Sequence, residues 1–153
     1  MVAIKFAVWA SAAGALIPIM AVLNSRLGAA VQNPLHASVI LFAIGLVACL
    51  TVALIMSGSL PDFSKLASAQ PLDFAGGLIV CCYVISATLV APRFGVGNFI
   101  LFAVAAQVIS AALIDHFGLF GSMVRQVNFL RLGGILLLLT GLVITQVANA
   151  RTA

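Results

Sequence analysis

The sequence is poor in charge and contains no glutamate. Of its 153 residues, 7% are charged and 64% are hydrophobic, and the mean hydropathy is +1.29. Soluble domains carry roughly a quarter charged residues, and a chain this short could not hide so much apolar surface from water. The composition therefore excludes a soluble globular domain and indicates an integral membrane protein.

Signatures of enzymes and of metal sites are also missing. The chain has no paired carboxylates within an apolar run, no nucleophile elbow and no phosphate-binding loop. Its cysteines, Cys49, Cys81 and Cys82, lie in apolar runs and show neither CxxC nor Cys/His spacing. We therefore expect no enzymatic activity, no metal and no cofactor.

The net charge of +4 would suggest nucleic acid as a partner for a soluble protein. Here the basic residues occur singly at the ends of apolar runs, and no aromatic platform accompanies them. The pattern argues against nucleic acid and favours contact with the headgroups of a lipid bilayer.

Five apolar stretches are each long enough to cross a bilayer. A helix rises about 1.5 Å per residue, so roughly 20 residues cross a hydrocarbon core of about 30 Å. Helices are required because lipid cannot satisfy unpaired backbone groups and the sequence has no alternating strand pattern. We predict an all-α integral membrane protein with a single transmembrane domain, residues 1–153, and five transmembrane helices at about 6–23, 35–56, 74–91, 98–114 and 132–147.

The connections between the spans are predicted from their turn residues. We expect a polar turn at 24–28 and a tight connection at 92–95. The first apolar stretch is too long for a signal peptide and lacks a convincing small-residue cleavage site, so we interpret it as a span. In the segment 117–130, apolar side chains recur at helical spacing with polar ones between them, which predicts an interfacial segment.

An odd number of spans places the two ends of the chain on opposite sides of the membrane. One side then carries Lys5, Lys65, Arg125 and Arg131, and the other carries Arg26, Arg93 and Arg151. Four against three leaves almost no positive-inside bias. Insertion in both orientations and an accidental balance in a small protein both explain this pattern.

Polar groups inside spans are the candidates for function, because they are costly in lipid. Gln107 lies about halfway along the fourth span. Its amide can line a substrate cavity or bond another helix. Ser110, Tyr83 and Trp9 complete the candidate substrate contacts.

Asp115 and His116 end the fourth span. Because histidine titrates near physiological pH, the pair could couple protons at the mouth of a cavity. The alternative is a helix cap, or a salt bridge from Asp115 to Arg125 or Arg131.

Other features have both a structural and a functional interpretation. Pro18 removes a backbone donor and clashes with the carbonyl of Gly14, which predicts a kink or hinge. Arg26 and Arg93 are expected on the same side, as headgroup anchors or as an anion gate. Gly134, Gly141 and Ala148 recur every seven residues on one face of the fifth span, which predicts packing within the chain or a dimer seam.

Several of these motifs together resemble one family. The stretch 14–28 (GALIP followed by NSRLG), the stretch 91–97 (APRFGVG) and the stretch 114–121 (IDHFGLFG), with Gln107 and Gly141, resemble the YdcZ-type family of the drug/metabolite transporter superfamily. The resemblance covers most of the chain. It implies a multi-pass bacterial inner-membrane transporter of a small organic metabolite or amphipathic solute, with five helices per chain.

The superfamily resemblance also implies an assembly. Its ten-helix members look like two inverted five-helix halves, so a homodimer, antiparallel in orientation, or a heterodimer with a related chain would rebuild that arrangement. Substrate would bind near the midplane and be moved by alternating access. A flippase for lipid or lipid-linked headgroups, and a non-transporting subunit of a partner complex, are the alternatives.

Two departures from the family pattern weaken parts of this expectation. Met20 stands where the family often has glutamine, and Ala106 stands where glycine commonly precedes the glutamine of the fourth span.

Gly134 and Gly141 resemble the dimerisation helix of small multidrug-resistance transporters. The membrane-embedded glutamate of those transporters is missing, so their mechanism of proton antiport is not supported.

Overall fold

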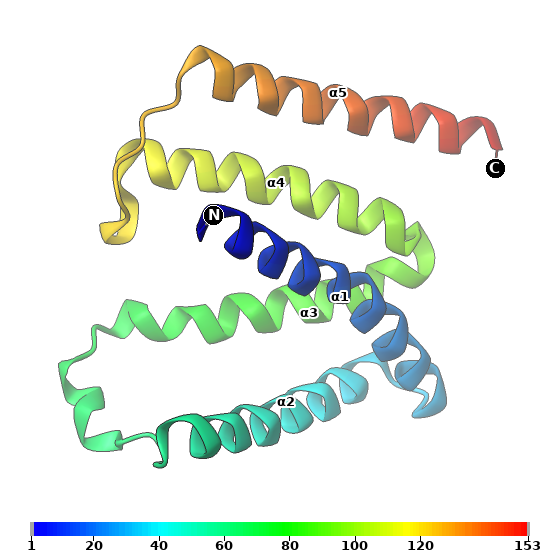
Figure 1. The fold of residues 1–153 in the computed structure, drawn as a ribbon. Coiled ribbons are helices and arrows are strands. Elements are labelled where there is room, and N and C mark those ends of the chain that lie inside the picture. Colours follow the sequence, from blue (N-terminus) through cyan, green and yellow to red (C-terminus); the bar gives the residue numbers. More distant parts are fainter. Residues whose placement is uncertain (1, 153) are drawn as a thin grey trace. The chain divides into compact units, whose positions relative to one another are not determined.

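The computed structural model describes residues 2–152, and its regular structure there is helical, with no strand (Figure 1). The long helices are α1 (Val2–Ala30), α2 (Pro34–Ser57), α3 (Ala75–Phe94), α4 (Val96–Phe117) and α5 (Phe129–Thr152). Each of these five contains a stretch that is long and apolar enough to span a membrane. The predicted fold class is confirmed.

The chain divides into two compact units, with the boundary between Val96 and Gly97. The first, which we call the three-helix unit, contains α1, α2 and α3. The second, the two-helix unit, contains α4 and α5.

Small residues make the core of the three-helix unit, in which each helix contacts the other two. Ala21, Ala37 and Ala91 are almost inaccessible. Gly28 is buried as well, and a Cβ atom added to it would lie 3.2 Å from the Cα atom of Pro34. Lipid provides no hydrophobic force between helices, so this close backbone approach is what allows them to pack.

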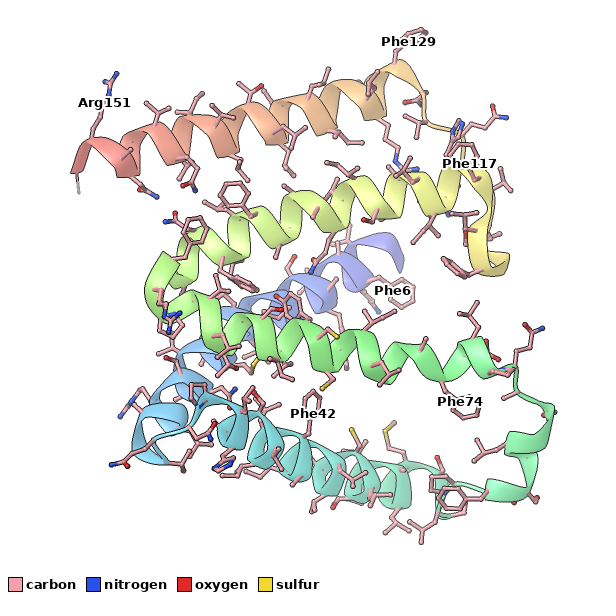
Figure 2. The ribbon with its side chains drawn as sticks, turned by 180° about the vertical axis from the view of Figure 1, so that it is seen from behind. Phe6, Phe42, Phe74, Phe117, Phe129 and Arg151 are labelled. Carbon is pink, nitrogen blue, oxygen red and sulfur yellow. The ribbon has the colours of Figure 1, made fainter. Side chains whose placement is uncertain are left out.

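Large apolar side chains extend outward from the helices. Phe6, Phe74 and Phe129 are 70%, 52% and 94% exposed and project away from the ribbon (Figure 2). Such an apolar outer surface suits lipid rather than water.

Helix α1 continues beyond its expected end, so the predicted polar turn at 24–28 is wrong. Residues 24–28 are helical, and the chain turns only after Ala30. Asn33 then caps α2, accepting hydrogen bonds from the N–H groups of Leu35 (2.9 Å) and His36 (3.3 Å). The helix persists because Asn24 and Gly28 make buried contacts with the neighbouring helices, which outweigh their turn preference.

The connection between α3 and α4 is shorter than expected. Pro92 and Arg93 belong to the last turn of α3, and Gly95 alone separates the two helices. Its φ of 92° is readily adopted only by glycine, and its N–H donates to the carbonyl of Ala91 at 2.9 Å.

Two short 3₁₀ helices, η1 (Phe63–Ser68) and η2 (Pro71–Phe74), connect α2 to α3. Asp62 caps η1 by accepting from the hydroxyl (2.6 Å) and the N–H (3.0 Å) of Ser64. These bonds hold the pKa of Asp62 below its usual value. In η2 the bond runs the other way along the chain: Asp73, inside the helix, accepts from the N–H of the N-cap residue Gln70 at 2.9 Å.

The helical spacing of apolar residues in 117–130 does not produce a continuous helix: between α4 and α5 the segment contains one short 3₁₀ turn, η3 (Leu119–Gly121), and is otherwise irregular. Its interfacial position stays a prediction. Gly118 and Gly121 have φ values of 63° and 76°, which interrupt a right-handed helix. After η3 the segment bonds to the end of α4: the N–H of Arg125 donates to the carbonyl of Asp115 at 2.8 Å. Apolar spacing alone did not reveal this competition.

Candidate functional site

A cluster of polar side chains lies inside the three-helix unit, with one residue from each helix. Asn24 of α1, Ser38 of α2 and Thr88 of α3 are each only 3% exposed. The Nδ2 atom of Asn24 donates to Oγ1 of Thr88 at 2.6 Å. The hydroxyl of Ser38 lies 3.4 Å from Thr88 Oγ1 and 3.3 Å from the carbonyl oxygen of Pro34.

The hydrogen bonds of Thr88 fix the orientation of the Asn24 amide. The single hydroxyl proton of Thr88 is donated to the carbonyl of Val84 at 2.8 Å, so Thr88 must accept from Asn24. The amide nitrogen of Asn24 therefore faces Thr88. Its Oδ1 atom is buried and has no hydrogen-bond partner among the residues that the structure describes. Such an orphaned acceptor costs about 1–3 kcal/mol.

Two hollows adjoin this cluster. The first, which we call the α1–α2 groove, has a volume of about 270 Å³ and is lined by Asn24 and five apolar residues, Met20, Leu23, Leu27, Leu41 and Ile44. The second has a volume of about 320 Å³, and Thr88 lies in its wall beside Gly28 and Pro92. The Asn24–Thr88 hydrogen bond therefore joins the walls of two separate hollows.

Basic side chains are found at the same end of the three-helix unit. The bond between Asn24 and Thr88 brings the ends of α1 and α3 together, and Arg26 and Arg93 follow these residues. Both arginines are exposed, as is His36 at the start of α2. This end of the unit is therefore positively charged.

Trp9 and Tyr83 lie in different surroundings within the three-helix unit. Trp9 is 81% exposed and, with Lys5, lines a wide apolar hollow of about 750 Å³ along the first half of α1. Tyr83 of α3 is half-buried and does not line that hollow.

Pro18 does not break α1, which continues through it as a single helix. Figure 1 shows this helix curving along its length. A hollow of about 280 Å³ lies against Pro18, with Ile19, Val22 and Leu23 in its wall.

Polar side chains join α4 and α5 at both ends of the two-helix unit. At the start of α4, Asn98 Oδ1 accepts from Gln146 Nε2 (3.1 Å) and from Asn149 Nδ2 (2.8 Å). At the end of α4, Asp115 forms an ion pair of 2.7 Å with Arg131, and each side chain is 33% exposed.

Asp115 and His116 have separate partners. Asp115 forms a salt bridge with Arg131, as the structural alternative to proton coupling expected. Nδ1 of His116 accepts instead from the N–H of Val127 at 3.1 Å. A nitrogen that accepts carries no proton, so this arrangement requires an imidazole that is unprotonated at Nδ1. The two residues together attach the segment after α4 to the helix end.

Gln107 is exposed in the middle of α4, and Ser110 is exposed one turn later. In the part of the chain that the structure describes, no hydrogen bond to the Gln107 amide is found. Asn98 precedes Gln107 by nine residues, about two and a half turns, so the amide points away from the side of Asn98 that is bonded to α5.

The two glycines of α5 lie on another side of the helix from its bonds to α4. Gly134 and Gly141 are rotated roughly 60 to 80° around the helix from Arg131 and Asn149, at 3.6 residues per turn. Both are exposed, and a Cβ atom added to either would meet nothing within 4 Å. This glycine face, Gly134 and Gly141, has room for a further helix, whereas Ala148, the third small residue of the series, takes part in a contact.

The sequence did not single out Asn24, Ser38 or Thr88 as site residues. Asn24 was placed in a turn, and hydroxyl residues are common in apolar runs. The available signal was that Asn24 and Thr88 are both uncharged polar residues near the ends of predicted spans on the same side of the membrane.

A model of the family described as "Putative inner membrane exporter, YdcZ" matches residues 6–144, from α1 into α5. No curated protein and no solved structure matches the chain. The matched region includes the polar cluster, Gln107 and the Asp115–Arg131 pair. The chain therefore belongs to the YdcZ family of drug/metabolite transporters and is a multi-pass protein of the inner membrane.

Proposed function

We propose that the protein exports a small organic metabolite or amphipathic solute by alternating access, and that its working form is a dimer. The observation that carries the proposal is the exposed amide of Gln107 in the middle of α4. An amide without a partner is costly in hydrocarbon, and polar groups at this depth usually face a cavity or another helix. A solute or a second chain would cover it.

A dimer is supported by features of the two-helix unit. The glycine face of α5 is open, and close approach through glycine is a common way for membrane helices to associate. Gln107 lies near the middle of its span, which is where carriers built from inverted repeats bind their substrates. Two copies of a five-helix chain would supply such repeats.

Export can be tested with purified protein in liposomes on a solid-supported membrane. The liposomes would be challenged with amines, amino acids, sugars and organic acids, with and without a pH gradient. We expect a saturable current that falls at least tenfold in Gln107→Leu and persists in Gln126→Leu, a matched change outside the helices. Transport by Gln107→Leu at the original rate would remove Gln107 from the site and overturn the proposal.

The same experiment tests proton coupling. Asp115 and His116 remain the candidates for it, because they are the acid and the histidine at the end of α4. If they couple protons, a pH gradient should drive the current, and Asp115→Asn should remove that dependence. A current that ignores the gradient would leave these residues with the structural role that their hydrogen bonds describe.

A further inference from the structure

We infer that the α1–α2 groove binds a single-chain amphipathic molecule, whose uncharged hydroxyl or amide head donates a hydrogen bond to Oδ1 of Asn24. The inference concerns binding to the three-helix unit alone. It therefore does not depend on transport or on Gln107.

The first argument is the orphaned acceptor. Asn24 is only 3% exposed, and its Oδ1 atom lacks a donor among the described residues. The amide cannot turn to satisfy this oxygen, because its nitrogen is held by Thr88 at 2.6 Å. A buried acceptor of this kind is explained by a missing donor, and a ligand can supply one.

Charge selects the kind of donor. None of the three helices of this unit contains an aspartate or glutamate. The charges near this end are those of Arg26 and Arg93, which repel a cation. A quaternary ammonium has no N–H to donate, and a primary ammonium would lack a counterion. An uncharged hydroxyl or amide meets neither difficulty.

The groove accommodates a slender apolar body. Except for Asn24, its walls consist of methionine, leucine and isoleucine side chains. Its volume of about 270 Å³ lies below the roughly 300 to 1,000 Å³ typical of pockets for drug-sized ligands. Asn24 lies toward the end of α1, so the polar head would lie near the membrane surface and the chain would extend beside Met20.

Met20 is the residue of the groove that lies one helical turn before Asn24. It lies four residues before Asn24, on the same face of α1, and both residues line the groove. The Oδ1 atom is covered in this structure, so a ligand reaches it only after a neighbouring side chain moves. Methionine and leucine have no hydrogen to donate, so either side chain can move aside without losing a hydrogen bond.

The position of Met20 also provides the decisive variant. Glutamine and asparagine four residues apart on a helix can bond to each other. Met20→Gln would therefore supply an internal donor to Asn24 and remove the need for the ligand. Met20→Leu is the matched control, because it keeps the side chain apolar and leaves the acceptor orphaned.

The test uses the full chain in phosphatidylcholine nanodiscs, since the phosphocholine headgroup carries no hydrogen-bond donor. The probes are 1-decanol and decyl methyl ether, which differ in the O–H group, and decyltrimethylammonium. Binding is measured as a saturable shift in the midpoint of thermal unfolding, read from the fluorescence of Trp9, the single tryptophan of the chain. Each variant is compared with empty nanodiscs.

We expect decanol to bind about tenfold more tightly than the ether, as an otherwise unmade hydrogen bond predicts. This preference should persist in Met20→Leu and in Gln107→Leu and disappear in Met20→Gln. The cation should show no dependence on residue 20. Equal binding of decanol and ether, or an unchanged preference in Met20→Gln, would overturn the inference.

A lipid headgroup is the other possible source of a donor, and a second lipid separates the two. Phosphatidylethanolamine carries an ammonium donor, and because that donor is charged we expect it to leave the decanol preference intact. Loss of the preference in phosphatidylethanolamine nanodiscs would assign the groove to lipid and contradict binding of a free amphiphile. Loss of transport in Gln107→Leu has no bearing on either result, so the two proposals fail separately.

Discussion

The two units of this protein hold their helices together in different ways. In the three-helix unit, alanines and Gly28 allow close packing, and the Asn24–Thr88 bond is fully buried. In the two-helix unit, polar contacts join α4 to α5 at both ends, through Asn98 at one end and the Asp115–Arg131 pair at the other. Between those ends, the glycine face of α5 is open.

This difference teaches what the polar residues of a membrane protein do at different depths. Inside the three-helix unit they replace contacts that lipid cannot supply, so their loss should affect the folded state. At the ends of α4 and α5 they lie where water is available, and their contribution should be smaller. A unit whose hydrogen bonds and ion pair lie toward its ends also keeps surface for a partner or a solute.

The largest effect should come from the closest helix contact. Gly28→Leu places a side chain where even a Cβ atom would lie 3.2 Å from the backbone of Pro34, whereas the surroundings of Gly45 are empty to 4 Å. We expect Gly28→Leu to lower the free energy of unfolding by about 3 kcal/mol, the upper end of the usual overpacking cost. The unfolding of the three-helix unit can be followed by Trp9 fluorescence in nanodiscs.

Gly45→Leu is the control for this prediction. It makes the same change in α2, where no neighbouring atom is displaced, and should leave the unfolding midpoint near that of the original protein. Equal destabilisation by both variants would show that glycine itself, rather than close approach to Pro34, is required. Close packing of the helices would then not distinguish the three-helix unit from the two-helix unit.

A smaller effect is expected from the buried cluster. Thr88→Val removes the acceptor of the Asn24 amide and leaves both of its polar atoms unsatisfied, which should cost about 1 to 3 kcal/mol. Thr140→Val is the matched change in α5, where the hydroxyl only bonds the carbonyl of Leu136 in its own helix. We expect little change there. Similar unfolding midpoints for the two variants would contradict a special role for Thr88.

The same threonines show why the sequence could not reveal the cluster. Thr51, Thr140 and Thr145 each donate to the carbonyl four residues earlier at 2.8 Å, and so does Thr88. In sequence all four are hydroxyl residues within an apolar helix. What distinguishes Thr88 is its contact with Asn24, 64 positions earlier, and this contact depends on how α1 packs against α3.

The existence of the helices, by contrast, was predictable. The length of each apolar stretch is set by the thickness of the bilayer, and this constraint does not depend on neighbouring helices. Their ends were harder to place. Asparagine and glycine are typical turn residues, but contacts with α2 and α3 keep Asn24 and Gly28 helical. The conformation of the segment after α4 could not be predicted for a similar reason, since its backbone bonds to Asp115 and His116.

Gln107 was identified as a candidate from its chemistry alone, because a lone amide in an apolar helix is unusual and costly. The structure adds which side of α4 it occupies. Proton handling by Asp115 and His116 stays a prediction, and the structure adds the contacts of each side chain. A sequence places Asp115 beside His116, but only coordinates show that their side chains have separate partners, Arg131 and Val127.

The smallest effect should come from breaking the ion pair at the end of α4. Asp115 and Arg131 are each 33% exposed, so we expect Asp115→Leu to cost about 0.5 to 1 kcal/mol despite the short distance of 2.7 Å. The global midpoint should hardly change. Hydrogen exchange in residues 118–128 should instead become about two- to fivefold faster. The ion pair holds the start of α5 beside Asp115, and the carbonyl of Asp115 also accepts the hydrogen bond from this segment.

A charge swap shows whether the ion pair itself is responsible. The double variant with Asp115→Arg and Arg131→Asp should restore slow exchange, whereas Arg125→Gln should leave it unchanged, since Arg125 bonds Asp115 through its backbone N–H. If the swap fails to restore protection, the attachment depends on the hydrogen bond of His116 rather than on charge. If Asp115→Leu instead unfolds the whole two-helix unit, its end contacts are as important as the buried cluster, and the distinction between the two units is wrong.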